Sequence, residues 1–124
     1  MDKQKTVLVA EDDSLYASVY QNKLTKEGYN VVVVANGMDA VKKAVELKPN
    51  LILMDLIMPE MDGFTALEKI KSNPATKKLK VIVTSNLGQD SDIKRAKDLG
   101  AEEYFVKANI SIQELIEKIK THIK

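Results

Sequence analysis

Acidic side chains follow two of the most apolar segments of this 124-residue sequence. Glu11, Asp12 and Asp13 stand directly after one apolar run, and Asp55 stands directly after another. Carboxylates gathered at a partly buried site repel one another, so a cation must compensate for their charge or some of them must hold protons. Oxygen ligands without histidine or cysteine suit a hard cation, and a few carboxylates with room for water suit Mg²⁺ better than Ca²⁺.

Two hydroxyls and a lysine stand at the ends of two further apolar runs. Thr84 and Ser85 are the last residues of one run, and Lys107 directly follows the other. A carboxylate beside Mg²⁺ and an ammonium group is equipped for in-line attack on a phosphoryl group, and Asp55 is the nucleophile that we predict. Each residue alone has a simpler interpretation, because an acid or a serine after a strand often caps the next helix and a lysine is often only solvated. Their joint occurrence after four apolar runs favours one shared site.

The runs that must position these side chains are short, rich in β-branched residues and mostly apolar throughout, which is typical of strands covered on both faces. Longer segments between them carry apolar residues at helical spacing. Ser111 and Glu114 have the spacing of a capping box. The predicted strands are residues 6–10, 31–35, 51–54, 81–85 and 104–106, and the predicted helices are residues 14–27, 38–48, 64–72, 90–99 and 111–123.

Strict alternation of strand and helix, with right-handed crossovers, predicts a parallel five-stranded sheet with helices on both faces, a (βα)5 doubly wound α/β fold. In such a sheet ligands bind outside the carboxyl ends of the strands, which is where the acids, the hydroxyls and the lysine stand. The chain is long enough for one core and too short for two, so we expect a single domain over residues 1–124.

The composition argues against several classes of function. Nineteen Lys and Arg against eighteen Asp and Glu leave a net charge of +1, which favours neither nucleic acid nor an anionic membrane. The absence of cysteine removes disulfides, thiolate metal sites and a cysteine nucleophile. No apolar run approaches the ~20 residues that span a bilayer, and no secretory stretch follows the first residues. We therefore expect a cytoplasmic protein without membrane insertion or direct nucleic-acid binding.

At residues 7–13, 54–63 and 100–107 the sequence closely resembles the receiver domain of two-component response regulators, and the resemblance covers essentially the whole chain. The middle segment, from Met54 to Gly63, is highly specific. The resemblance implies a flavodoxin-like sheet with strand order 2-1-3-4-5. It also implies a phosphoacceptor signalling domain, not an enzyme, whose partner affinity changes on phosphorylation.

The same resemblance implies a role for each residue of the site. Asp55 matches the aspartate that accepts the phosphoryl group, and Lys107 matches the lysine that pairs with it. Asp13 falls outside the family's acidic pair. The implied Mg²⁺ ligands are Asp12, Asp55, the backbone carbonyl of Ile57 and, through water, Glu11.

The family's switch hydroxyl matches Ser85, which lies thirty residues after Asp55 and twenty-two before Lys107. Thr84 is the alternative, and the choice matters because a step of one residue along a strand sends the side chain to the opposite face. Tyr104, three residues before Lys107, matches the family's switch aromatic.

Two residues depart from the family pattern. Ala108 stands where the family usually has a proline after the lysine, often with a cis peptide bond; a cis bond here would cost about 3 kcal/mol, so we expect a trans bond and a differently shaped loop. Asn86 stands where the family usually has a small residue, which predicts narrower entry for a phosphodonor.

Ile57 and Leu87 are apolar at the two positions that the resemblance associates with the attacking water. This predicts slow loss of the phosphoryl group.

We interpret the chain as a stand-alone receiver that takes its phosphoryl group from a histidine kinase or a histidine phosphotransfer protein. The phosphorylated form is expected to bind an unidentified partner through the fourth helix, fifth strand and fifth helix. That face carries basic residues whose simpler and favoured interpretation is that of solvated charges: Lys94, Arg95, Lys97, Lys118 and Lys120.

Other interpretations use the same acids. The chain could be a receiver fragment of a larger regulator or hybrid kinase. A phosphohydrolase of the haloacid dehalogenase type wants a second acid where Ile57 stands, and a flavin-binding module would place phosphate against Glu11, Asp12 and Asp13, which repel it. His122 is expected to be solvated, with the phosphodonor histidine on the partner.

Overall fold

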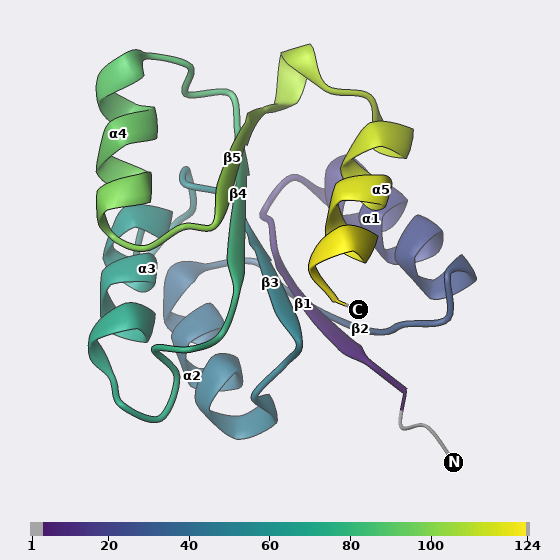
Figure 1. Cartoon of the computed structure of the whole chain (residues 1–124), viewed down its shortest axis with the longest axis horizontal. Helices are drawn as coiled ribbons and strands as arrows, with labels where there is room; N and C mark the ends of the chain where they lie inside the picture. Colours follow the sequence, from purple (N-terminus) through teal and green to yellow (C-terminus); the bar gives the residue numbers. More distant parts are fainter. Residues whose placement is uncertain (1–3, 124) are drawn as a thin grey trace.

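The computed structural model describes residues 4–123, which form a parallel five-stranded sheet between two layers of helices (Figure 1). The strands are β1 (Thr6–Ala10), β2 (Asn30–Val34), β3 (Leu51–Met54), β4 (Val81–Ser85) and β5 (Glu103–Val106). The helices are α1 (Ser14–Lys26), α2 (Gly37–Leu47), α3 (Gly63–Ser72), α4 (Asp90–Asp98) and α5 (Ile112–His122), with a 3₁₀ helix η1 (Lys107–Asn109) after β5. The strand order is β2-β1-β3-β4-β5, which confirms the predicted fold class and order.

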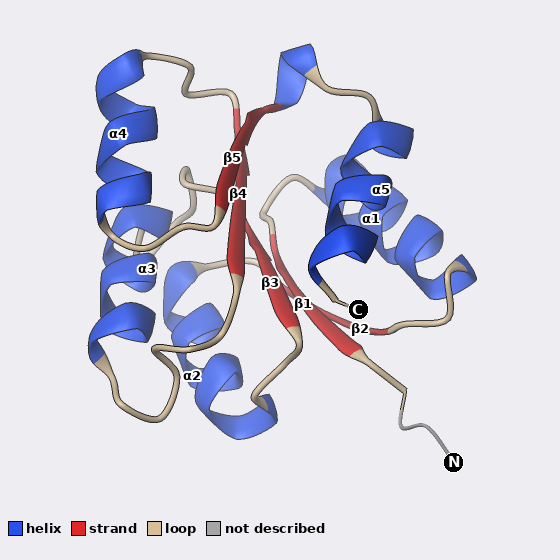
Figure 2. Cartoon of the chain, viewed as in Figure 1, coloured by secondary structure: helices blue, strands red, loops and turns tan. Residues whose placement is uncertain are grey.

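Helices α1 and α5 cover one face of the sheet, and α2, α3 and α4 cover the other, as Figure 2 shows. Alternate residues of each central strand enter different cores: in β3, Ile52 faces the α2–α4 side and Leu53 faces the α1/α5 side. Both are buried, and full burial of such a side chain contributes about 1.5–3 kcal/mol. Strand β3 is therefore apolar at every position because neither of its faces meets water.

Polar side chains set where the helices begin. Asp13, Asn36, Asp62 and Ser111 each accept a hydrogen bond from a backbone N–H in the first turn of the next helix. Ser111 and Glu114 form the predicted capping box. A cap of this kind stabilises a helix by about 1 kcal/mol, so these short polar residues fix the point at which each of the four helices begins.

The structure differs from the sequence prediction at the sheet margins. Strand β2 lies one residue earlier than predicted, because its parallel register with β1 pairs Ala10 with Val34 and leaves Ala35 exposed in the loop. Strand β5 begins at Glu103, which pairs with Ile82. The helix η1 was not predicted. No cis peptide bond occurs among residues 4–123, which confirms a trans bond before Ala108.

The parallel register aligns the carboxyl ends of the central strands. Ala10 pairs with Met54, and Ser85 pairs with Val106. The residues after these pairs therefore leave the sheet at one edge. No helix in the described part of the chain is long and apolar enough to cross a membrane.

Candidate functional site

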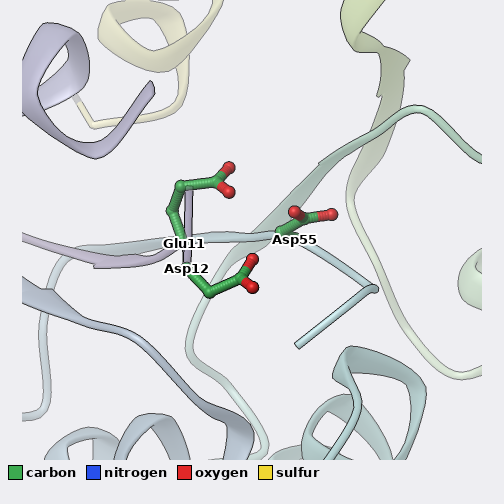
Figure 3. A group of neighbouring side chains, drawn as sticks. All are labelled: Glu11, Asp12 and Asp55. Carbon is green, nitrogen blue, oxygen red and sulfur yellow. The ribbon is translucent and has the colours of Figure 1, made fainter. Parts of the chain in front are cut away.

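Three carboxylates meet at the carboxyl edge of the sheet (Figure 3). Glu11 and Asp12 follow β1, Asp55 follows β3, and one oxygen of each lies within 4.8 Å of the other two. Glu11 and Asp55 are buried, whereas Asp12 is exposed. The parallel register produces this meeting, since the two strand ends are neighbours in the sheet.

Asp13 is the adjacent acid, and its side chain is engaged elsewhere. Its Oδ1 accepts hydrogen bonds from the backbone N–H groups of Leu15 (2.9 Å) and Tyr16 (3.3 Å), which makes it the N-cap of α1. Its own N–H donates to Glu11 Oε2 at 3.1 Å. The helix-cap interpretation therefore applies to Asp13 and not to its two neighbours.

Lys107 reaches the cluster from the end of β5. Its Nζ lies 2.7 Å from Glu11 Oε1 and 3.1 Å from Asp55 Oδ2, and only 5% of its side chain is exposed. Burial works against the ammonium charge most strongly, but the contact with Glu11 and the charges of both carboxylates outweigh it and raise the pKa of Lys107 above its ordinary value. Lys107 is therefore a cation held in place by two acids.

Lys107 compensates for the negative charge of Glu11 only in part. Burial, and after it the charge of Asp55, raises the pKa of Glu11 to about 7 against the opposing influence of Lys107. Glu11 Oε1 is buried 2.7 Å from Lys107 Nζ, and apart from this ion pair it has no hydrogen-bond partner among residues 4–123. One ammonium does not satisfy this group of acids.

The backbone holds Asp55 in a fixed orientation. Its Oδ1 accepts hydrogen bonds from the N–H groups of Leu56 (2.7 Å) and Ile57 (3.3 Å), while Oδ2 faces Lys107. Gly63 makes this turn possible: its N–H donates to the Leu56 carbonyl, and a Cβ there would lie 2.2 Å from the Asp55 carbonyl oxygen. Only glycine fits this close approach of α3 to the strand end.

The two hydroxyls of β4 lie on opposite faces of the sheet. Ser85 Oγ accepts a hydrogen bond from Leu87 N at 3.3 Å, and the Leu87 carbonyl accepts one from the Tyr104 hydroxyl. Thr84 lies two residues after Ile82, which belongs to the α1/α5 core, and within the described chain its Oγ1 is buried without a hydrogen-bond partner. Ser85 and Tyr104 therefore share one loop, and Thr84 does not.

The remaining predicted positions lie around this edge and at the end of α5. The Ile57 side chain is 55% exposed, and Asn86 is exposed. The expectation of a solvated His122 is wrong: its Nε2 lies 2.5 Å from Glu103 Oε2, because the last turn of α5 packs beside the first residue of β5. Lys120 of the predicted basic face pairs with a glutamate at the C-terminal end of α1 at 3.0 Å, and Lys94 and Arg95 also have intramolecular contacts.

One aromatic contact of the site was not predicted from the sequence. Lys107 Nζ lies 4.3 Å from the centre of the Tyr16 ring, within the range of a cation–π interaction. Tyr16 stands in the first turn of α1, immediately beyond the acidic cluster. An aromatic residue in the first turn of a helix that begins at the site is the signal that could have identified it.

The donor set suits a hard divalent cation. All candidate ligands are carboxylate oxygens within 4.8 Å of one another, and Glu11 Oε1 is a buried acceptor whose partner in the described chain is the Lys107 ammonium alone. Oxygen ligands at an open edge with room for water fit Mg²⁺. A carboxylate fixed beside an ammonium, as Asp55 is, can act as a nucleophile that forms a covalent intermediate.

Known proteins are similar to this chain in sequence and in fold. Residues 7–120 match the response regulator receiver domain family. The chemotaxis protein CheY of Treponema pallidum (strain Nichols) is 39% identical over 121 residues, which cover 95% of this chain and 82% of that protein. A response regulator from Chloroflexus aurantiacus J-10-fl is 27% identical, with a TM-score of 0.89 and coverage of 98% of both chains.

The receiver domain of the sensor histidine kinase PA1611 from Pseudomonas aeruginosa PAO1 is 26% identical, with a TM-score of 0.87 and coverage of 98% of both chains. That structure is described as having a magnesium ion coordinated in the active site cleft. The family match spans nearly all of the described chain and agrees with the fold and with the CheY relative. This chain belongs to the response regulator receiver domain family of two-component signalling.

Proposed function

We propose that the chain is a phosphorylation-dependent switch in which Asp55 accepts a phosphoryl group from a phosphohistidine of a histidine kinase or histidine phosphotransfer protein. The observation that carries this proposal is the setting of Asp55: one oxygen is bound to two backbone N–H groups, and the other faces the buried ammonium of Lys107. Fixing one oxygen leaves the other as the nucleophile in a single orientation, which lowers the entropic part of the barrier.

In the transfer step a bond forms between Asp55 Oδ2 and phosphorus as the phosphorus–nitrogen bond of the donor breaks, and the donor imidazole leaves. Lys107 then moves from its carboxylate partners to a phosphoryl oxygen. Asp12, Asp55, the Ile57 carbonyl and, through water, Glu11 would hold a Mg²⁺ ion, which would supply positive charge for the phosphoryl oxygens.

The switch itself runs through the loop after β4. Ser85 Oγ, the proposed phosphoryl-binding hydroxyl, is bonded to Leu87 N, and the carbonyl of Leu87 is bonded to Tyr104. A turn of Ser85 towards the phosphoryl group breaks its bond to Leu87 and frees the loop that holds Tyr104. The equilibrium between two such states needs to shift by only a few kcal/mol.

The proposed output surface is formed by α4, β5 and α5. A hollow of about 240 Å³ opens there between β5 and α5, lined by residues that include Tyr104, Ile110 and Lys118. Because Tyr104 lines this hollow and is also tied to the β4–α4 loop, a change at Ser85 alters the surface that a partner meets.

We further propose that residues 1–124 act as one stand-alone receiver. The CheY relative, of which the chain covers 82%, supports this organisation. The alternative is that the chain is a receiver segment of a larger regulator or hybrid kinase. The similarity to the receiver domain of a sensor histidine kinase is the observation that favours this alternative. A phosphohydrolase is disfavoured, since Ile57 occupies the position of its second acid.

The experiment that tests the phosphoacceptor is intact-mass analysis after incubation with Mg²⁺ and a small phosphodonor. The wild type is expected to gain one phosphoryl mass that hydroxylamine removes, and Asp55→Asn is expected to gain none. Asp13→Asn is the matched control, because asparagine keeps the helix cap and leaves the site unchanged. Equal uptake by Asp55→Asn and the wild type refutes the assignment.

A further inference from the structure

The Tyr16 ring contacts the same Lys107 ammonium that the two carboxylates bind. Glu11 Oε1 and Asp55 Oδ2 lie 2.7 and 3.1 Å from Lys107 Nζ, and the centre of the Tyr16 ring lies 4.3 Å from the same atom. The lysine comes from the end of β5 and the tyrosine from the first turn of α1, so the contact joins segments more than eighty residues apart. A desolvated ammonium over an aromatic face is held more strongly than one at an exposed surface.

The position of the ring is fixed from two directions. Asp13 caps α1 and accepts a hydrogen bond from Tyr16 N at 3.3 Å, which places the first turn of the helix. Tyr20, one turn further and buried, packs against the ring with centroids 5.8 Å apart. The start of the helix and the packing against Tyr20 therefore place the Tyr16 ring beside the lysine.

An aromatic face suits the motion that Lys107 must make. A lysine side chain is flexible, and its ammonium is attracted to the whole face of a ring without a required donor direction. Lys107 can therefore turn from Glu11 towards a phosphoryl oxygen while staying over Tyr16. A third carboxylate in place of the ring would hold the ammonium by charge and would repel the incoming phosphoryl group.

We propose that Tyr16 is a positioning residue that holds the Lys107 ammonium beside Asp55 while the phosphoryl group is transferred. This inference rests on the proposed function of Asp55. With a small phosphodonor, the bond between Asp55 and phosphorus forms as the donor's phosphorus–oxygen bond breaks, and negative charge gathers where Lys107 stands. Loss of the ring leaves the lysine tethered by its carboxylates alone, so the ammonium reaches the transferring group less often.

The test compares Tyr16→Leu with Tyr16→Phe in the full chain. With Mg²⁺ and a small phosphodonor, Tyr16→Leu is expected to take up phosphoryl about five- to thirtyfold more slowly than the wild type, the range that a desolvated cation–π contact provides. Tyr16→Phe keeps the ring and is expected to stay within about twofold of the wild type. Tyr29→Leu, a tyrosine replaced outside the site, is the matched control and is expected to react at the wild-type rate.

A spectroscopic measurement separates positioning from general damage to the fold. The ring over Lys107 shifts the proton resonances of its Cε methylene group upfield, so this shift is expected in the wild type and Tyr16→Phe and is expected to vanish in Tyr16→Leu. Mg²⁺ affinity, measured by titration calorimetry, is expected to be the same in all three proteins. If Tyr16→Leu does not fold, Tyr16→Met replaces it as a variant without a ring.

Wild-type rates in the ringless variant, or equally slow rates in Tyr16→Phe, overturn the proposal. A wild type that takes up no phosphoryl refutes the proposed function instead, and the Lys107 resonances then report on the ring contact alone. An unshifted Lys107 methylene in the wild type overturns the contact itself.

Discussion

Replacing Asp12 by alanine is predicted to stabilise the protein when metal is removed. Asp12 is the exposed member of a group of three carboxylates whose oxygens lie within 4.8 Å of one another. Lys107 is paired with the other two acids, Glu11 and Asp55, so the charge of Asp12 mainly adds repulsion. Removing that charge relieves the folded state more than the unfolded chain, in which the three acids are further apart.

The distance sets the magnitude. Two unit charges 4.8 Å apart repel by about 0.9 kcal/mol in water and by about 3.5 kcal/mol at an effective dielectric constant of about 20. Asp12 is exposed, so the lower limit applies to each of its two acidic neighbours, and the nearby N-terminus of α1, which favours an acid, offsets part of the gain. We expect Asp12→Ala to raise the free energy of unfolding by about 1 kcal/mol without metal.

Asp13→Ala is the matched control and is predicted to have the opposite sign. It removes the two hydrogen bonds that cap α1, which costs about 1 kcal/mol. Urea unfolding followed by far-ultraviolet circular dichroism, with a chelator, measures both effects; the chain has no tryptophan to serve as a probe. Mg²⁺ at a hundred times its dissociation constant is expected to stabilise the wild type and Asp13→Ala by about 2.7 kcal/mol and Asp12→Ala by far less.

Two results would refute this reasoning. If Asp12→Ala destabilises the metal-free protein as Asp13→Ala does, charge repulsion is not the dominant effect at Asp12. If Asp12→Ala keeps the full stabilisation by Mg²⁺, then Asp12 does not hold the ion and the register of the acidic cluster is shifted.

Three further predictions concern the same edge of the sheet. Gly63→Ala places a Cβ 2.2 Å from the Asp55 carbonyl oxygen. We therefore expect the free energy of unfolding in urea to fall by about 2–3 kcal/mol and phosphoryl uptake, followed by mass, to become slower. Wild-type values for both measurements would contradict the close approach. Burial raises the pKa of Glu11 to about 7 in the folded state, against 4.5 in the unfolded chain, so between these pH values the folded state holds a proton that the unfolded chain has released. Metal-free stability is therefore expected to fall by about 3 kcal/mol as pH rises through that window. Glu11→Gln is expected to abolish this fall, and its persistence would point to another group. Ile57 and Leu87 cannot orient water, so the phosphorylated wild type is expected to decay more slowly, by intact mass, than Ile57→Asn combined with Leu87→Glu; equal decay rates would show that this pair does not control water access.

The sequence predicted the elements well because each element reports its surroundings locally. Strand β3 is apolar at every position since both of its faces are covered, and this is visible as an unbroken run in the sequence. Ser111 and Glu114 form a capping box through residues three apart, so the start of α5 is also a local property. The acids after β1 and β3 could be assigned to one edge because alternating strands and helices leave only a parallel arrangement.

The different roles of neighbouring side chains were harder to predict from the sequence. The family resemblance placed Asp12 in the acidic pair and Asp13 outside it; the structure adds the reason, because Asp13 accepts hydrogen bonds from the N–H groups of α1. In the same way, Thr84 and Ser85 are similar hydroxyls until the twist and pairing of β4 send one into the α1/α5 face and the other towards the loop that binds Tyr104.

The sequence by itself determined the fold class, the strand order through the family resemblance, and the set of chemical groups at the sheet edge, because these depend on periodicity, on caps and on the residues directly after each strand. Only the tertiary structure decided which groups touch. Tyr16 lies over Lys107 and His122 pairs with Glu103 because helices α1 and α5 dock on the sheet at particular positions. The one-residue shift of β2 has the same origin, since pairing with β1 sets where an edge strand begins and ends.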